Sequence, residues 1–166
     1  GDAHLDGERS NVEATLTTLH AWRIVTDELI SQRGGRVFGG AGDSLVAEFP
    51  SIVNAVSCAV DIQRELDHRN SALPERRRMR FRIGVNVGDV VIEDGDILGD
   101  GVNIAARLEA VAEPGGVALS GAVREHLVGR IGSKFRDGGL RELKNIDRPI
   151  QVWLWEPAGV SPQVIP

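Results

Sequence analysis

The spacing of apolar residues changes repeatedly along this chain, and this feature constrains its fold most strongly. From Asn11 to Leu29 apolar residues recur every three or four positions, which predicts an amphipathic helix. The same spacing follows Ser51, a suitable N-cap, and returns between Val102 and Ala112. Short alternating or continuous apolar segments between these helices predict strands. The predicted order is α-β-β-α-β-β-α-β-α-β-β.

This order predicts an α+β fold with a ferredoxin-like core: a mainly antiparallel sheet with helices packed on one face. We expect residues 1–155 to form one domain and the Pro-rich residues 156–166 to be a loose tail. The other predicted elements are strands at 36–38, 44–49, 79–87, 90–92 and 117–120, a polar loop at 93–100, a helix at 121–130, and two or three strands between 134 and 155.

Charge and cysteine content exclude several classes of function. The formal net charge is -5 and the pI is about 5.4, which argues against a nucleic-acid partner. The single cysteine, Cys58, excludes an internal disulfide and a cysteine-based zinc site, and we expect it in the core. No apolar run approaches the ~20 residues that span a bilayer, and no signal peptide is recognisable. We therefore expect a cytoplasmic domain without membrane contact, cut from a larger protein because it lacks an initial Met.

Three segments carry residues suited to phosphate chemistry, although each has a simpler explanation. Asp43 ends a glycine-rich turn, where it is either a turn former or a magnesium ligand. Asn103 and Arg107 share one face of a predicted helix, either as a surface pair or as groups aimed at a phosphoryl centre. Lys144 lies between apolar residues of a predicted late strand, either at an exposed edge or directed at a polyphosphate.

Taken together, these segments resemble class III adenylate and guanylate cyclases of the bacterial type. The resemblance covers residues 12–155 and is carried by the runs FRIGVNVGD (81–89), DILGDGVNIAARL (96–108) and AEPGG (112–116). It implies the nucleotide cyclase fold and conversion of a nucleoside triphosphate, here ATP or alternatively GTP, to its 3′,5′-cyclic monophosphate and pyrophosphate. It also implies a homodimer with active sites at the interface, a role in signal transduction, and two Mg²⁺ or Mn²⁺ ions per site.

The resemblance assigns roles to six residues. It implies metal ligands at Asp43 and at Asp2, with Asp6 a weaker alternative, and an adenine-reading carboxylate at Asp96. Asn103 corresponds to the residue that positions the ribose, and Arg107 to the one that stabilises charge on the α-phosphate. Lys144 corresponds to the lysine that contacts the terminal phosphates.

The sequence departs from the family pattern at three places. No apolar strand precedes Asp2 and no Gly-aromatic pair follows it, so we expect the first metal-binding strand to be incomplete. Gly39 stands where adenylate cyclases usually carry an adenine-reading lysine. Asp89 stands where some members carry an arginine that contacts phosphate.

These departures leave two alternatives beside an active adenylate cyclase. One is a catalytically degenerate cyclase homology domain that dimerises and serves as a regulatory or nucleotide-sensing module. The other is a diguanylate cyclase, which the glycines before Asp43 suggest superficially but which does not account for Asn103 and Arg107.

Overall fold

A computed structural model describes residues 22–38, 45–88, 91–93, 96–127 and 129–157 of the chain. Only the backbone is described for 91–93, 96–98 and 100. A helix covers residues 22–32. The elements that follow are β1 (Arg36–Phe38), β2 (Val46–Glu48), α2 (Ile52–Ser71), the 3₁₀ turn η1 (Glu75–Arg77), β3 (Ile83–Val85), β4 (Val91–Glu93), β5 (Asp96–Leu98), α3 (Asp100–Val111), β6 (Val117–Ser120), α4 (Gly121–Glu125), α5 (Arg130–Ser133), β7 (Arg136–Arg141) and β8 (Ile150–Trp155).

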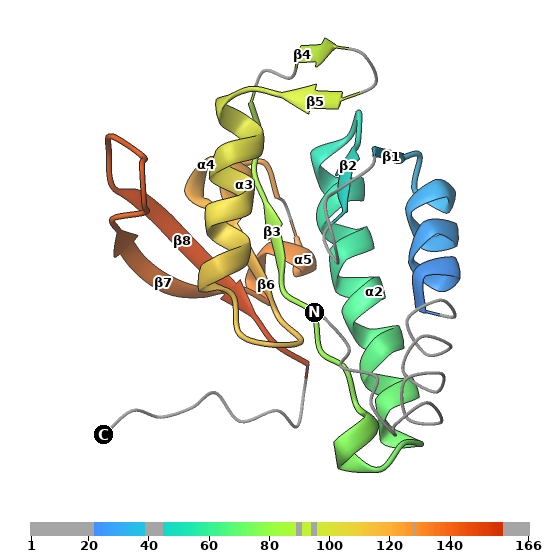
Figure 1. The fold of residues 1–166 in the computed structure, drawn as a ribbon. Helices are drawn as coiled ribbons and strands as arrows, with labels where there is room; N and C mark the ends of the chain where they lie inside the picture. Colours follow the sequence, from blue (N-terminus) through green and yellow to red (C-terminus); the bar gives the residue numbers. More distant parts are fainter. Residues whose placement is uncertain (1–21, 39–44, 89–90, 94–95, 128, 158–166) are drawn as a thin grey trace, which may run out of the picture.

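The central sheet has the strand order β3-β6-β8-β7 (Figure 1). β3 and β6 are parallel, and α3 lies in the connection between them, as a parallel crossover requires. β8 pairs antiparallel with both β6 and β7. Two antiparallel hairpins, β1-β2 and β4-β5, complete the described strands. The predicted α+β class with a mainly antiparallel sheet is confirmed.

Helices cover both faces of this sheet, so the prediction that they pack on one face was wrong. Alternate residues of β6 point to opposite sides: Val117 and Leu119 pack in a cluster with α2 and α4, whereas Ala118 packs with α3. β8 divides in the same way, with Trp155 on the α2 side and Leu154 on the α3 side. Strands that are apolar at successive positions indicate burial on both faces, and VALS (117–120) shows this pattern.

A third apolar cluster joins the helix over 22–32, α2 and the β1-β2 hairpin. Trp22, Ile30 and Cys58 are buried in it, which confirms the core position predicted for the cysteine. Trp22 also packs edge-on against Phe81, with ring centroids 5.7 Å apart. The Arg33 guanidinium donates to the Asp61 carboxylate at 2.7 Å and ties the end of the first helix to α2.

The strand predicted at 79–87 is shorter in the structure, and buried side chains of α2 explain why. Asn70 donates to the Met79 carbonyl and accepts from the Met79 amide, so this backbone is satisfied by a side chain instead of a neighbouring strand. Gln63 is 2% exposed, and its amide donates to the carbonyls of Phe81 and Gly116, each at 2.8 Å. The Phe81 carbonyl also accepts from the Gly115 amide at 2.7 Å, and regular ladder pairing with β6 begins at Ile83.

Two other predicted segments also differ from the structure, while the start of α2 is confirmed. Residues 96–98 form β5 where a polar loop was expected. The helix predicted over 121–130 is instead two short helices: α4 ends at Glu125, and α5 begins after Gly129, whose φ of 73° lies outside helical geometry. The Ser51 hydroxyl accepts from the Asn54 amide at 3.1 Å, as predicted for the N-cap. Across the described residues, no helix has the length and apolar character needed to cross a membrane.

Candidate active site

The candidate site is centred on the first turns of α3, which β5 precedes directly. Gly99 forms the junction with a φ of 131°, a conformation that residues with a β-carbon rarely adopt. The Gly99 carbonyl accepts from the amides of Val102 and Asn103 and starts the helix. The path from β5 into α3 is therefore fixed by a glycine at the turn. Figure 1 shows the N-terminal end of α3 and both hairpins at the same end of the molecule.

α3 is packed against the chain of β3 through three alternate residues, Gly84, Asn86 and Gly88, which we call the α3 seat. A β-carbon at Gly84 would be 2.2 Å from the carbonyl oxygen of Ala105 and 2.5 Å from the backbone nitrogen of Glu109. A β-carbon at Gly88 would be 3.2 Å from the α-carbon of Gly101. Between them, the Asn86 side-chain amide donates to the Gly101 carbonyl at 3.4 Å. The seat thus holds the helix along the row Gly101, Ala105, Glu109.

Asn103 and Arg107 lie on a different row of α3, four residues apart and therefore one turn from each other. They are offset from the seated row by two residues, or about 200° around the helix axis. Asn103 is exposed and Arg107 is half-buried, and neither side chain bonds to another described residue. The predicted pair therefore does share a face, directed away from β3, where an amide and a guanidinium can bind a common ligand.

Glu109, near the C-terminal end of α3, carries a half-buried carboxyl. Burial raises the pKa of Glu109, and the nearby Arg82 guanidinium acts in the opposite direction. Glu109 belongs to the seated row, where its backbone nitrogen lies against Gly84, on the side of the helix opposite to Arg107.

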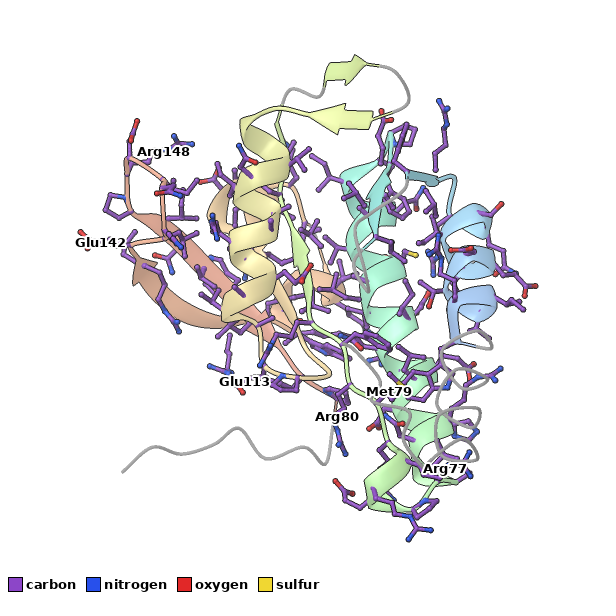
Figure 2. The ribbon with its side chains drawn as sticks, viewed as in Figure 1. Arg77, Met79, Arg80, Glu113, Glu142 and Arg148 are labelled. Carbon is purple, nitrogen blue, oxygen red and sulfur yellow. The ribbon has the colours of Figure 1, made fainter. Side chains whose placement is uncertain are left out.

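Lys144 lies in a turn between β7 and β8, whereas the sequence predicted a strand. The Ile146 amide donates to the Leu143 carbonyl at 3.1 Å, and Asn145 has a φ of 63°, which closes a tight turn that a strand cannot contain. Leu143 and Ile146 pack in the same cluster as Ile104 of α3, while Lys144 itself is exposed. Figure 2 labels Glu142 and Arg148, which flank this turn in the connection between β7 and β8.

Asp96 is the first residue of β5 and pairs with Glu93 of β4, three residues before Gly99. Its side chain is not described. Asp2, Asp6, Gly39, Asp43 and Asp89 lie outside the described residues, although in sequence Asp43 falls between the paired strands β1 and β2. Within the part of the chain that the structure describes, no three His, Cys, Asp or Glu residues could together hold a metal ion.

The sequence predicts one strand over residues 79–87 and does not by itself predict the seat. A signal for it was present, since glycine within a strand often marks a close approach of another backbone. Gly84 and Gly88 flank Asn86 at this spacing. The sequence could therefore have indicated a close contact on this face of the strand, but not that α3 makes it.

Comparison with known proteins places these features in one family. The family described as the adenylate and guanylate cyclase catalytic domain matches residues 10–156. A Rhizobium meliloti protein named "Putative adenylate cyclase 3" is 47% identical over 146 residues, which are 87% of this chain and 25% of that protein. The chain thus spans a quarter of that relative's length.

Solved structures show the same relationship. The chain is similar to an adenylate/guanylate cyclase/hydrolase from Silicibacter pomeroyi, with a TM-score of 0.78, 38% identity and coverage of 95% of this chain and 92% of that one. The catalytic core of a rhodopsin-guanylyl cyclase with converted specificity, in complex with ATPαS, has a TM-score of 0.69 at 22% identity, covering 86% and 82%. This second similarity concerns the fold alone.

Proposed function

Because this chain belongs to the family of adenylate and guanylate cyclase catalytic domains, we propose that it converts ATP to 3′,5′-cyclic AMP and pyrophosphate as a homodimer. The observation that carries this proposal is the row of α3 that presents Asn103 and Arg107 on one accessible face. An exposed amide and a half-buried guanidinium one turn apart suit the recognition of a ribose and the phosphate attached to it.

In the proposed reaction the ribose 3′-oxygen attacks the α-phosphorus of the same nucleotide. A bond forms between these atoms, the bond from the α-phosphorus to the bridging oxygen of the β-phosphate breaks, and pyrophosphate leaves in line with the attack. The proton of the 3′-hydroxyl passes to water. Bound divalent cations would supply Lewis-acid activation of the hydroxyl and neutralisation of the triphosphate charge.

The side chains of this chain then have distinct tasks. Arg107 stabilises the negative charge that shifts on the α-phosphate during transfer, and its contact is strongest in the transition state. Asn103 orients the ribose so that its 3′-oxygen points at the phosphorus. Lys144 holds the terminal phosphates as an exposed point charge. Asp96 accepts a hydrogen bond from the adenine amino group, which favours ATP over GTP.

The residues assigned to the divalent cations are Asp43 and Asp2. Carboxylate oxygens are the ligands that Mg²⁺ prefers, usually one or two of them together with substrate phosphate oxygens, so this donor set fits the ion. In the sequence Asp43 follows β1 and precedes β2.

A homodimer accounts for the openness of the site. Asn103 is exposed on a helix surface, so another structural element must provide the opposite wall of a site that excludes water. In a symmetric dimer each subunit supplies the same elements to two equivalent sites. Asn103 and Arg107 of one subunit would then face the segment between β1 and β2, which carries Asp43, in the partner subunit.

A degenerate regulatory domain is the second candidate, and Gly39 is the observation that favours it. A glycine there has no side chain to read the adenine ring, so nucleotide selection depends on Asp96 alone. Such a domain would dimerise and bind nucleotide without turning it over.

The test is cyclic nucleotide production from ATP and from GTP with Mn²⁺, on the full-length protein. Formation of cyclic AMP in excess of cyclic GMP supports the proposal. Equal rates for the two nucleotides would refute the assigned role of Asp96. Absence of both products from a chain that light scattering shows to be dimeric would favour the degenerate domain.

A further inference from the structure

We infer that Asn86 is a positioning residue, whose side-chain amide fixes the axial position of α3 and thereby the placement of Asn103 and Arg107. The inference goes beyond the proposed function by adding a residue that contacts no substrate. It rests on the proposed function for its catalytic consequence, while its structural part can be tested independently.

The first step concerns the shape of the seat. Gly84 and Gly88 allow the backbones of β3 and α3 to approach closely, but neither glycine has a side chain that could enter a gap between helix turns. Ile104 and Leu108 pack α3 against the sheet, whereas the glycines of the seat set only how closely the helix approaches β3. At the seat, the axial position of the first turn therefore depends on a directional contact.

The Asn86 amide provides that contact. Among the described residues, the bond from Asn86 Nδ2 to the Gly101 carbonyl is the one hydrogen bond that joins residues 83–88 to α3. Gly101 lies in the first turn of the helix, where helical geometry also directs its carbonyl at the Ala105 amide. A second donor at this carbonyl fixes the turn that immediately precedes Asn103.

The consequence for the site follows from the rigidity of the helix. An α-helix is rigid along its axis, so an axial shift of its first turn moves Asn103 and Arg107 by the same distance. The rise of about 1.5 Å per residue gives the scale of such a shift. Displacements of this order cost rate, since a misplacement of 1 Å can cost about a hundredfold in catalysis. Losing Asn86 should thus act on catalysis through the Asn103 and Arg107 row.

The variant for the test is Asn86→Ala, which removes the donor without adding charge near a triphosphate. The matched control is Asn70→Ala, which removes the two bonds between Asn70 and the Met79 backbone, on the far side of β3 from α3. Asn70 is 4% exposed and makes the shorter bonds, so its loss should lower the unfolding temperature more than that of Asn86. Asn86→Gln, which keeps an amide donor, should restore part of the lost function.

The structural readout is hydrogen exchange of the backbone amides of residues 103–107. After correction for each variant's change in the free energy of global unfolding, we expect exchange there to become several-fold faster in Asn86→Ala and to be unchanged in Asn70→Ala. Unchanged exchange in Asn86→Ala would overturn the inference, whether or not the chain makes cyclic AMP. The failure of the inference is therefore distinguishable from failure of the proposed function, which appears as a wild-type chain without product.

The catalytic readout is a double-mutant cycle with Arg107→Ala. We expect Asn86→Ala alone to lower kcat about tenfold with little change in KM, and to have a smaller effect, the part that acts through Asn103, when Arg107 is already alanine. Equal effects in both backgrounds would show that Asn86 acts independently of Arg107 and would contradict its positioning role.

Discussion

Gly84 of β3 lies directly against the backbone of Ala105 in α3, with room for a hydrogen but not for a methyl group. A β-carbon would be 2.2 Å from the Ala105 carbonyl oxygen, and the obstacle is backbone that cannot rotate away. Gly84→Ala must therefore push α3 from the sheet or distort β3. We predict a loss of about 3 kcal/mol in the free energy of unfolding, measured by urea denaturation.

The control for this prediction is Gly132→Ala in α5. A β-carbon there would make ordinary contacts, the nearest at 3.4 Å, and alanine stabilises helical backbone relative to glycine. We expect no loss and up to about 1 kcal/mol of gain. A Gly84→Ala protein as stable as wild type would mean that α3 is not seated on β3 as described.

The buried thiol of Cys58 should make stability depend on alkaline pH. Burial, and secondarily the charge of Asp61, raises the pKa of Cys58 from 9.0 to about 11, and Arg33 opposes the shift weakly. Above pH 9 the unfolded thiol loses its proton while the folded thiol keeps it. Stability due to this group is thus complete below pH 9 and falls as the pH rises to about 11, by about 2 kcal/mol.

The measurement is the free energy of unfolding of wild type and Cys58→Ala at several pH values from 8 to 11. Both proteins share all other titrating groups, so the difference between their pH profiles isolates the thiol. We expect wild type to lose more stability than the variant over this range. Parallel profiles would contradict the assigned burial, and so would rapid alkylation of Cys58 in the folded protein at pH 8.

A homodimeric site predicts complementation between two inactive variants. Asp43→Ala removes a proposed metal ligand and Arg107→Ala removes the group that stabilises charge on the α-phosphate. If one site takes Asp43 from one subunit and Arg107 from the other, a mixed dimer has one intact site and one doubly altered site. We expect mixing the two proteins to restore up to about a quarter of wild-type activity. An inactive mixture whose subunits have exchanged would place both residues of a site on one subunit.

The periodicity of the sequence was sufficient for most of the fold. Helix-type spacing and the Ser51 cap located α2, and the apolar run at 117–120 located β6. Both elements are stabilised by burial of apolar side chains, and this burial requires an apolar pattern that is visible in the sequence. The short extent of β3 could not be predicted, since it depends on Gln63 and Asn70, whose side chains reach the backbone of residues 79–81 from a helix. Contacts between residues that are this far apart in the sequence produce no local pattern of residue types.

The candidate site was predictable to the same limited degree. The four-residue spacing of Asn103 and Arg107 gave their common face because both lie on one helix. The apolar residues Leu143 and Ile146 favour a strand at Lys144, but in the structure they are the two ends of a turn, with Leu143 buried and Ile146 partly buried in the cluster that contains Ile104 of α3. The contact between Asn86 and Gly101 joins residues 15 apart and depends on how β3 and α3 cross, which periodicity does not encode.

The central claim is that the Arg107 face of α3 stabilises the transition state of cyclic nucleotide formation. The most direct test measures kcat and KM for ATP with Mn²⁺ in wild type, Arg107→Ala and Arg76→Ala, the last an exposed arginine in η1 at the opposite end of the molecule. We predict that Arg107→Ala lowers kcat by about 10²–10³-fold with a smaller change in KM, while Arg76→Ala matches wild type. Wild-type kcat in Arg107→Ala, or the same loss in both variants, would contradict the account.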